Sequence, residues 1–234
     1  MWLKLFMCLL LAHLVADFIL QTSASCKSKA EKHARSVHQY IHASIVFALA
    51  WLASWDLHFW WGALIIGVAH LCIDIWKSYR PEKLTWFVLD QVLHVGMQAL
   101  VAWLWILRHD WSIPMDIELK YVAIMVAAIV CWKPANIFIK LMLRYYSVNM
   151  PEGRENGFNA GALIGTIERW LILIFVCLQR YDALGLLIAA KSIIRFSEKD
   201  TAKTEYVLAG TLLSIFIAVV AGLLVMTPGF CRGR

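Results

Sequence analysis

Long apolar stretches separated by short polar segments make up most of this 234-residue chain. A helix that crosses a membrane needs roughly 20 mostly apolar residues. By that measure the pattern predicts about eight membrane helices. They cover residues 2–21, 37–55, 59–78, 85–107, 117–132, 160–179, 182–196 and 205–226. Because the stretch at 182–196 is short, alternatives are seven membrane helices or a shallow hairpin made from the sixth and seventh.

These helices group into three segments of an all-α, polytopic transmembrane bundle. Residues 1–110 form a four-helix membrane bundle. Residues 111–159 hold the fifth helix, an amphipathic stretch at 135–146 that we expect on the membrane surface, and a loop containing Pro and Gly. Residues 160–234 form a C-terminal segment of three membrane helices.

The composition excludes an ordinary soluble domain. The chain is 61% hydrophobic and 16% charged, with a mean hydropathy of +0.67, whereas soluble proteins are about 45–50% apolar and about 25% charged. The six Cys are scattered, so neither a disulfide framework nor a zinc–thiolate site is predicted. We interpret residues 1–21 as a retained membrane helix rather than a signal peptide, because its basic start is a single Lys4 and its apolar stretch contains His13 and Asp17.

The basic residues predict the orientation. The net charge is +6, and most Lys and Arg lie in short loops between apolar stretches, which indicates topology and contact with anionic lipids rather than nucleic acid. Loop 22–36 carries four basic residues and loop 77–84 carries three. The positive-inside rule makes these two loops cytoplasmic and directs both termini to the opposite side.

Each of the first four predicted helices carries two ionisable side chains spaced i,i+4, on one face of the helix. These pairs are His13 and Asp17, His38 and His42, His70 and Asp74, and Asp90 and His94. A single such pair is more often a cap or a solvated group than a ligand. All four, however, fall at a similar level just inside the cytoplasmic face. Ionisable groups in membrane helices are costly and usually mark function, so we predict a metal site.

The ligand types indicate which metal is favoured. Imidazole and carboxylate without thiolate suit zinc, with iron(II) and manganese as alternatives. Eight candidates exceed the four ligands of one zinc, so the site holds two ions, or one ion with the remaining residues orienting its ligands. Asp17, Asp74 and Asp90 are also the candidates for a catalytic general base.

A second polar group lies in the C-terminal segment. Glu168 and Arg169 lie on the sixth helix, Lys191 and Arg195 lie on the seventh, and Glu205 opens the eighth. Ion pairing between helices is one explanation for these residues, and a pocket for a phosphate-bearing headgroup is the other. The predicted substrate-binding residues are Lys77, Arg80, Glu168, Lys191 and Arg195.

Three functions are consistent with these features. The first is a metal-dependent hydrolase that acts on a lipid or lipid-like substrate, with membrane lipids as its surroundings. The second is a structural or partner-binding membrane subunit, in a homo-oligomer or with another membrane protein, in which the metal holds the bundle together. The third is a metal or proton transporter, which the apolar outer halves of the first four helices disfavour.

Sequence motifs point to one family. The stretches "LLLAHLVADFILQT", "HLCIDIWKSYR" and "FVLDQVLH" resemble an uncharacterised bacterial inner-membrane family catalogued as a domain of unknown function. The resemblance covers residues 5–107 well. The later "GALIGTIERWLILI", "LGLLIAAKSIIRF" and "TEYVLAGTLLS" resemble the longer members. The resemblance implies a bacterial inner-membrane location but no substrate.

Overall fold

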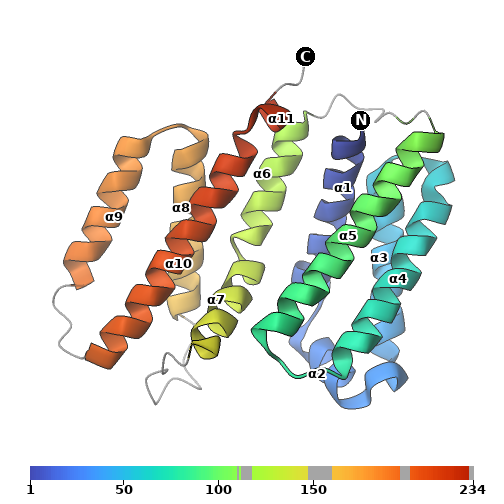
Figure 1. Ribbon diagram of the computed structural model, residues 1–234, viewed down its shortest axis with the longest axis horizontal. Helices are drawn as coiled ribbons and strands as arrows, with labels where there is room; N and C mark the ends of the chain where they lie inside the picture. Colours follow the sequence, from blue (N-terminus) through green and yellow to red (C-terminus); the bar gives the residue numbers. More distant parts are fainter. Residues whose placement is uncertain (110, 112–117, 147–159, 196–200, 232–234) are drawn as a thin grey trace. The chain divides into compact units, whose positions relative to one another are not determined.

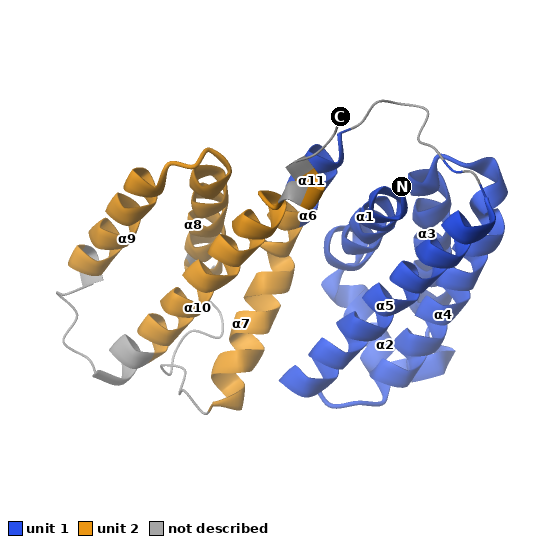
Figure 2. Ribbon diagram, turned by 45° about the horizontal axis from the view of Figure 1, so that its top comes forward, with its two compact units in different colours: residues 1–126 blue, residues 127–234 orange. Residues whose placement is uncertain are grey.

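The computed structural model describes residues 1–109, 111, 118–146, 160–195 and 201–231, and within these ranges it contains helices and turns without a strand (Figure 1). The all-α class predicted from the sequence is therefore confirmed. The chain divides into two compact units, Met1–Val126 and Ala127–Arg234 (Figure 2). The predicted loop at 147–159 lies outside the described residues.

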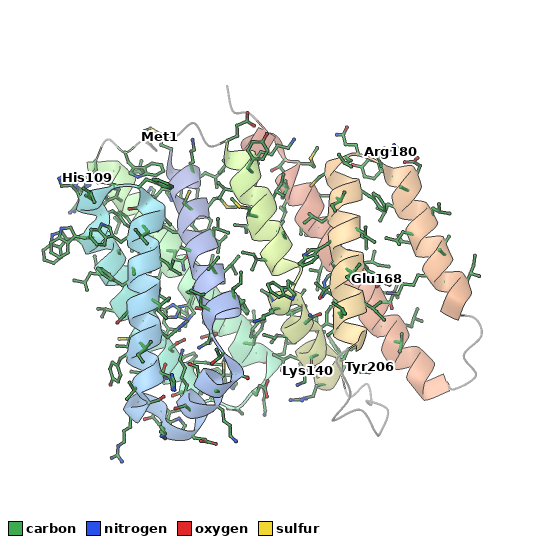
Figure 3. The ribbon with its side chains drawn as sticks, turned by 180° about the vertical axis from the view of Figure 1, so that it is seen from behind. Met1, His109, Lys140, Glu168, Arg180 and Tyr206 are labelled. Carbon is green, nitrogen blue, oxygen red and sulfur yellow. The ribbon has the colours of Figure 1, made fainter. Side chains whose placement is uncertain are left out.

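The N-terminal unit is built around four helices that follow one another along the chain. Contacts link α1 to α3, α3 to α4, α4 to α5, and α5 back to α1, which closes a four-helix arrangement. Met1 and His109, at the two ends of this set, lie at the same end of the unit (Figure 3). The bounds of its helices are α1 Trp2–Leu14, α2 Ser23–Lys32, α3 Val37–Ser54, α4 Trp60–Ser78, α5 Leu84–Arg108 and α6 Leu119–Val130, the last continuing into the second unit.

The segment at 22–36, expected to be a loop, instead contains the helix α2 followed by a 3-10 turn at His33–Arg35. Thr22 caps α2, since its Oγ1 accepts a hydrogen bond from the backbone N–H of Ser25 at 3.2 Å. Lys27 and Glu31 add an i,i+4 pair at 3.9 Å. This helix lacks an apolar stripe, which is why the hydrophobic pattern did not predict it. Figure 1 shows it at the end of the unit opposite the N-terminus.

An apolar core fills the part of the four-helix set nearer the N-terminus. It contains Leu5 and Leu9 of α1, Val46 of α3, Ile66 of α4 and Val101 of α5, each at most 6% exposed. These residues lie one to three turns along their helices from the ionisable pairs. The apolar core therefore closes the side of the polar layer that faces away from α2.

Several helices are long and apolar enough to cross a membrane. They are Trp2–Leu20, Leu57–Ser78, Leu84–Arg108 and Tyr206–Val225, and a fifth span results if α6 and α7, bent by 42° at their junction, are one broken crossing. Among the described residues the count of eight spans is not confirmed, since α8, α3 with its polar His38, Gln39 and His42, and α9 with only 15 residues are not among these helices. Large apolar side chains nevertheless face outward, such as Leu107 at 63% exposure and Phe216 at 65%, as expected for helices covered by lipid.

The C-terminal unit centres on the pair α8 and α10, with α7 against α10 and α9 against α8. Close packing depends on Gly222, because a Cβ there would lie 2.7 Å from Cγ1 of Val176. The stretch expected on the membrane surface is α7, which follows α6 after the bend and packs through buried Leu141 and Leu143. The bounds of these helices are α7 Lys133–Tyr145, α8 Ala160–Cys177, α9 Tyr181–Arg195, α10 Thr201–Val225 and α11 Pro228–Cys231.

Candidate metal centre

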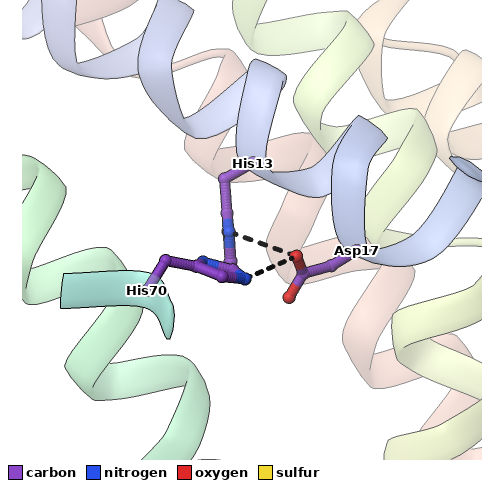
Figure 4. Close-up of side chains that lie close together, drawn as sticks. All are labelled: His13, Asp17 and His70. Carbon is purple, nitrogen blue, oxygen red and sulfur yellow. Dashed lines mark ion pairs between the residues drawn. The ribbon is translucent and has the colours of Figure 1, made fainter. Parts of the chain in front are cut away.

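A change of helix type positions the first pair of ionisable residues. His13 lies in the last turn of α1, and Asp17 lies in a π-helical turn, Val15–Leu20, that continues the helix. The turn ends where the backbone N–H of Gln21 donates to the carbonyl of Ala16 at 3.1 Å. A π-helical turn is wider than an α-turn and is frequent at functional sites. Figure 4 shows His13 and Asp17 on this segment with His70 from α4 facing them.

Three side chains from three helical segments meet most closely. The Asp17 Oδ1 atom lies 3.1 Å from Nε2 of His42 and 3.5 Å from Nε2 of His70. The two imidazole Nε2 atoms are 3.0 Å apart. Both rings are nearly fully buried, at 4% and 2% exposure. A carboxylate oxygen and two ring nitrogens therefore converge at one point inside the bundle.

Asp74 extends this group. Its Oδ2 atom lies 3.9 Å from Nε2 of His42 and 3.7 Å from Nε2 of His70. Its other oxygen, Oδ1, lies 3.6 Å from Nε2 of His94, which in turn lies 3.5 Å from Oδ1 of Asp90. The two oxygens of Asp74 thus face two different sets of ligand-type atoms. Such a carboxylate is suited to bridge two ions, which in two-metal sites lie about 3.5–4 Å apart.

The spacing of these atoms fits a small divalent ion. Ligands about 2.0–2.1 Å from a tetrahedral zinc lie roughly 3.3 Å from one another. The separations among Asp17, His42, His70 and Asp74 run from 3.0 to 3.9 Å. The second set, Asp74, Asp90 and His94, shows separations of 3.5 and 3.6 Å. Both sets therefore fit the first coordination shell of an ion without large rearrangement.

Several buried polar atoms of this cluster make no hydrogen bond within the protein. They include both ring nitrogens of His13, Nδ1 of His70, Nε2 of His94 and Oδ1 of Asp90. Buried polar atoms are usually paired, and leaving them unpaired is costly. His13 is 2% exposed, and its Nδ1 atom lies 3.6 Å from Oδ1 of Asp17. Unpaired ligand-type atoms at metal-ligand spacing are what a cation site requires.

The structure does not bring His38 into this cluster. Its side chain is exposed one turn before His42, at the start of α3. It lines a pocket with His42 instead. The other seven predicted ligands, His13, Asp17, His42, His70, Asp74, Asp90 and His94, lie together.

Lys29 was not among the residues predicted for the site, yet it reaches into the centre. It lies on α2, is 7% exposed, and donates from Nζ to Oδ2 of Asp74 at 2.6 Å. When the Gln21 amide is oriented with its oxygen toward this ammonium, that oxygen accepts a second hydrogen bond from Lys29 Nζ at 2.6 Å. The only signal in the sequence was the basic character of the segment, because the helix that aims Lys29 inward has no apolar periodicity.

Two of the predicted substrate residues, Lys77 in the last turn of α4 and Arg80 just after the helix, lie near the Asp90 end of the cluster. The Lys77 Nζ atom is 3.5 Å from Oδ2 of Asp90, and the Lys77 side chain is 24% exposed. Arg80 lies against the rings of Trp86 and Trp76, at 4.7 and 5.4 Å from their centroids. One cation therefore touches the cluster, and the other lies just beyond the end of α4.

Sulfur ligands are absent from the three groups of candidate ligands found among the described residues. Cys26 lies on α2, outside these groups. Partial burial raises the pKa of its thiol above the ordinary value, which keeps this side chain protonated at neutral pH. The candidate ligand set is therefore imidazole and carboxylate alone.

The polar group of the C-terminal unit is different in kind. Lys191 forms an ion pair with Glu168, as the sequence suggested. Arg169 is 1% exposed and donates to the carbonyl of Cys131 at 2.6 Å, to Ser214 Oγ at 2.9 Å and to Asn136 Oδ1 at 2.5 Å. The side chains of Arg195 and Glu205 lie outside the described ones. This group is a network of hydrogen bonds and one ion pair.

Comparison with protein families matches residues 5–134 to the family described as "Protein of unknown function (DUF3307)", and this match covers more than half of the chain. No curated protein and no solved structure matches the chain. The matched residues contain all seven clustered ligands together with Lys29.

Proposed function

The chain belongs to the DUF3307 family, and we propose that it is a membrane-embedded, metal-dependent hydrolase acting on a lipid or lipid-like substrate. The observation that carries this proposal is the convergence of seven imidazole and carboxylate side chains at metal-ligand spacing, five of them buried and two partly buried, with several unpaired atoms among them. A binding site for an ion explains both the spacing and the unpaired atoms.

In this proposal six of the seven clustered residues divide into two sets joined by Asp74, and His13 lies beside Asp17. Asp17, His42, His70 and one oxygen of Asp74 hold the first ion. The other oxygen of Asp74, with Asp90 and His94, forms the second set. Zinc is the favoured ion, with iron(II) and manganese as alternatives. A divalent ion there supplies Lewis acidity and activates water near neutral pH.

The surrounding residues supply the remaining roles. Where a single ion occupies the first set, Asp90 is the best candidate among the three carboxylates for the general base, because its Oδ1 atom makes no hydrogen bond. Lys77 lies against its other oxygen and is partly exposed, so it can contact an anionic group of the substrate. Arg80 lies further out, stacked on tryptophan rings. We assign to Lys77 and Arg80 the contacts with an anionic group that reaches the Asp90 side of the centre, and we give the Glu168–Lys191 pair a structural role.

We further propose that the chain spans a bacterial inner membrane eight times, with 22–36 and 77–84 on the cytoplasmic side. The seven basic residues of these two segments support this orientation. The metal site then lies just inside the cytoplasmic surface. The apolar core on its far side supports a hydrolase rather than a transporter, since a transporter needs a polar path to the opposite face.

A second candidate function is a structural subunit in which the ion holds the bundle together. The ion pairs Lys29–Asp74 and Lys77–Asp90 favour it, because they already neutralise two of the three carboxylates and link α2, α4 and α5. This alternative predicts that removal of the metal unfolds the N-terminal unit and that no lipid is hydrolysed.

Reconstitution separates the two functions. The purified protein is placed in vesicles of phosphatidylethanolamine, phosphatidylglycerol and phosphatidic acid, and release of phosphate and fatty acid is measured before chelation, after chelation and after return of zinc. The hydrolase predicts release that chelation abolishes and zinc restores, and that Asp90→Asn lowers roughly 100-fold or more. Asp56→Asn, at the residue that caps the Leu57–Phe59 turn, is the matched control. Stoichiometric metal without release of either product contradicts the hydrolase and favours the structural subunit.

A further inference from the structure

A pocket of about 190 Å³ opens beside the candidate metal centre, between the end of the π-helical turn, the start of α2 and the first turns of α3. His42, assigned above as a ligand of the first ion, forms part of its wall. The pocket therefore reaches from the protein surface to a residue of the metal centre.

The wall of this pocket is apolar on one side. Leu20, Ile41 and Ile45 line it. Leu20 and Ile41 are 49% and 50% exposed, so their side chains also face the surroundings of the bundle. From His38 to Ile45 the pocket follows α3 for seven residues, which corresponds to about 10 Å. This side suits a hydrocarbon chain that enters from the lipid.

The other side of the pocket is polar and lies at the end nearer α2. Thr22, Ser25 and His38 line it together with Gln21. Behind Gln21 lies the ammonium of Lys29, within hydrogen-bond reach of the Gln21 amide. Since the charge of Lys29 is already paired with Asp74, it is the charge of an ion bound beside His42 that favours an anionic group at this end.

We propose that this pocket binds the substrate, and that the substrate is an anionic amphiphile with its chain along Leu20, Ile41 and Ile45 and its headgroup at His38. This assignment rests on the proposed function, which places a metal ion next to His42. It also gives a role to His38, the one predicted ligand that lies apart from the metal cluster. A phosphate monoester carries both required features, a charged head and an apolar tail.

Binding of soluble probes to the zinc-loaded protein in detergent tests this assignment by calorimetry. The probes are hexyl phosphate, inorganic phosphate and hexanol. We expect hexyl phosphate to bind at least about tenfold more tightly than inorganic phosphate, since burial of two methylene groups already supplies that factor. Hexanol, without the anionic head, is expected to bind more weakly than hexyl phosphate by a similar factor.

Two variants locate the probe. Ile41→Trp fills the apolar side and is expected to remove the tenfold advantage of hexyl phosphate while leaving inorganic phosphate unchanged. Ile65→Trp on α4, 54% exposed and outside the pocket, is the matched control. His38→Gln is expected to weaken both phosphates several-fold without loss of zinc.

The outcomes distinguish this inference from the proposed function, because zinc is measured on the same samples by elemental analysis. Equal affinity for hexyl phosphate and inorganic phosphate would identify free phosphate as the ligand and overturn the amphiphile assignment. An Ile41→Trp variant that behaves like Ile65→Trp would overturn the placement of the chain. In both cases retained zinc leaves the metal centre standing, whereas absence of zinc from the wild type overturns the proposed function as well.

Discussion

Both compact units bury polar side chains among apolar helices, but they satisfy these side chains in different ways. In the C-terminal unit the guanidinium of Arg169 donates four hydrogen bonds, all to uncharged oxygens of Cys131, Asn136, Thr166 and Ser214. In the N-terminal unit, several buried ring nitrogens of the His/Asp cluster and one oxygen of Asp90 make no hydrogen bond within the protein.

We attribute this difference to a structural network in the C-terminal unit and to the proposed metal site in the N-terminal unit. A polar network whose members satisfy one another rigidifies a fold and needs nothing further. In the His/Asp cluster, nitrogen and oxygen atoms face one another at 3.0–3.9 Å, and there are too few hydrogen atoms to form a hydrogen bond for every pair. A bound cation would stabilise such a group of atoms. Changes to the first unit should therefore alter metal binding, and changes to the second should alter stability alone.

The largest expected effect is on metal affinity in Asp74→Asn, because Asp74 faces both ligand sets. Four ligands of a structural zinc site together supply about 10–16 kcal/mol, so one ligand is worth roughly 2.5–4 kcal/mol, or about 100- to 1,000-fold. Competition with a chelator measures the change. The control is His58→Ala, because the His58 side chain is 90% exposed, and this variant should bind zinc like the wild type. Wild-type affinity in Asp74→Asn would remove the bridging role.

Next in size is the loss of stability expected for Arg169→Met. The substitution leaves the carbonyl of Cys131, Oδ1 of Asn136 and Oγ of Ser214 without their donor. Each unpaired buried group costs about 1–3 kcal/mol, partly offset because a cation no longer has to be buried, so we expect about 3 kcal/mol. Thermal unfolding in detergent measures it, with exposed Arg180→Met as control. A simultaneous loss of metal would contradict the separation of the two units' roles.

A smaller loss of stability is expected for Gly222→Ala, where the new Cβ would lie 2.7 Å from Cγ1 of Val176. Overpacking of this kind costs about 1–3 kcal/mol. Gly161→Ala, at a position with no heavy atom within 4 Å of the added Cβ, should not lower the Tm. Both proteins should hold the wild-type amount of zinc. Equal melting temperatures for the two variants would show that α8 and α10 tolerate a wider separation.

The smallest effect has the opposite sign. Lys29→Met removes an ammonium that lies 2.6 Å from Oδ2 of Asp74, an oxygen assigned to the first ion. Like charges about 4 Å apart repel by roughly 1–4 kcal/mol, depending on the local dielectric, so zinc should bind about tenfold more tightly. Lys27→Met on the same helix, with its side chain 79% exposed, is the control. Weaker zinc binding in Lys29→Met would mean that Lys29 supports the ion instead of competing with it.

The sequence predicted all seven members of the His/Asp cluster, and it also predicted His38, which is not a member. Spacing of four residues puts His70 and Asp74 on one face of a helix, and alternating helix direction brings the four pairs to one depth. Rotation of each helix about its axis is set by packing that the sequence pattern does not specify. The face that α3 turns inward includes His42, whereas His38 one turn earlier lies beyond the cover of the neighbouring helices and is exposed.

Two features of the fold, the helix α2 and the π-helical turn, could not be predicted from the hydrophobic pattern of the sequence. The helix α2 is stabilised by local helix propensity and by the Thr22 cap, and it has no apolar stripe. The hydrophobic pattern therefore predicted a loop for its residues and gave no position for the Lys29 side chain. The π-helical turn that carries Asp17 depends on backbone hydrogen bonds that residue types do not specify. By contrast, the apolar helices and the Lys191–Glu168 pair followed from composition and from the need of buried charges for partners.

X-ray absorption at the zinc edge, combined with elemental analysis of the purified protein, measures both the amount of metal and its ligands. We predict one or two zinc ions per chain, with nitrogen and oxygen ligands at about 2.0–2.1 Å, imidazole scattering and no sulfur shell. Less than stoichiometric metal after reconstitution, or a sulfur shell near 2.3 Å, would contradict a centre built from these imidazoles and carboxylates.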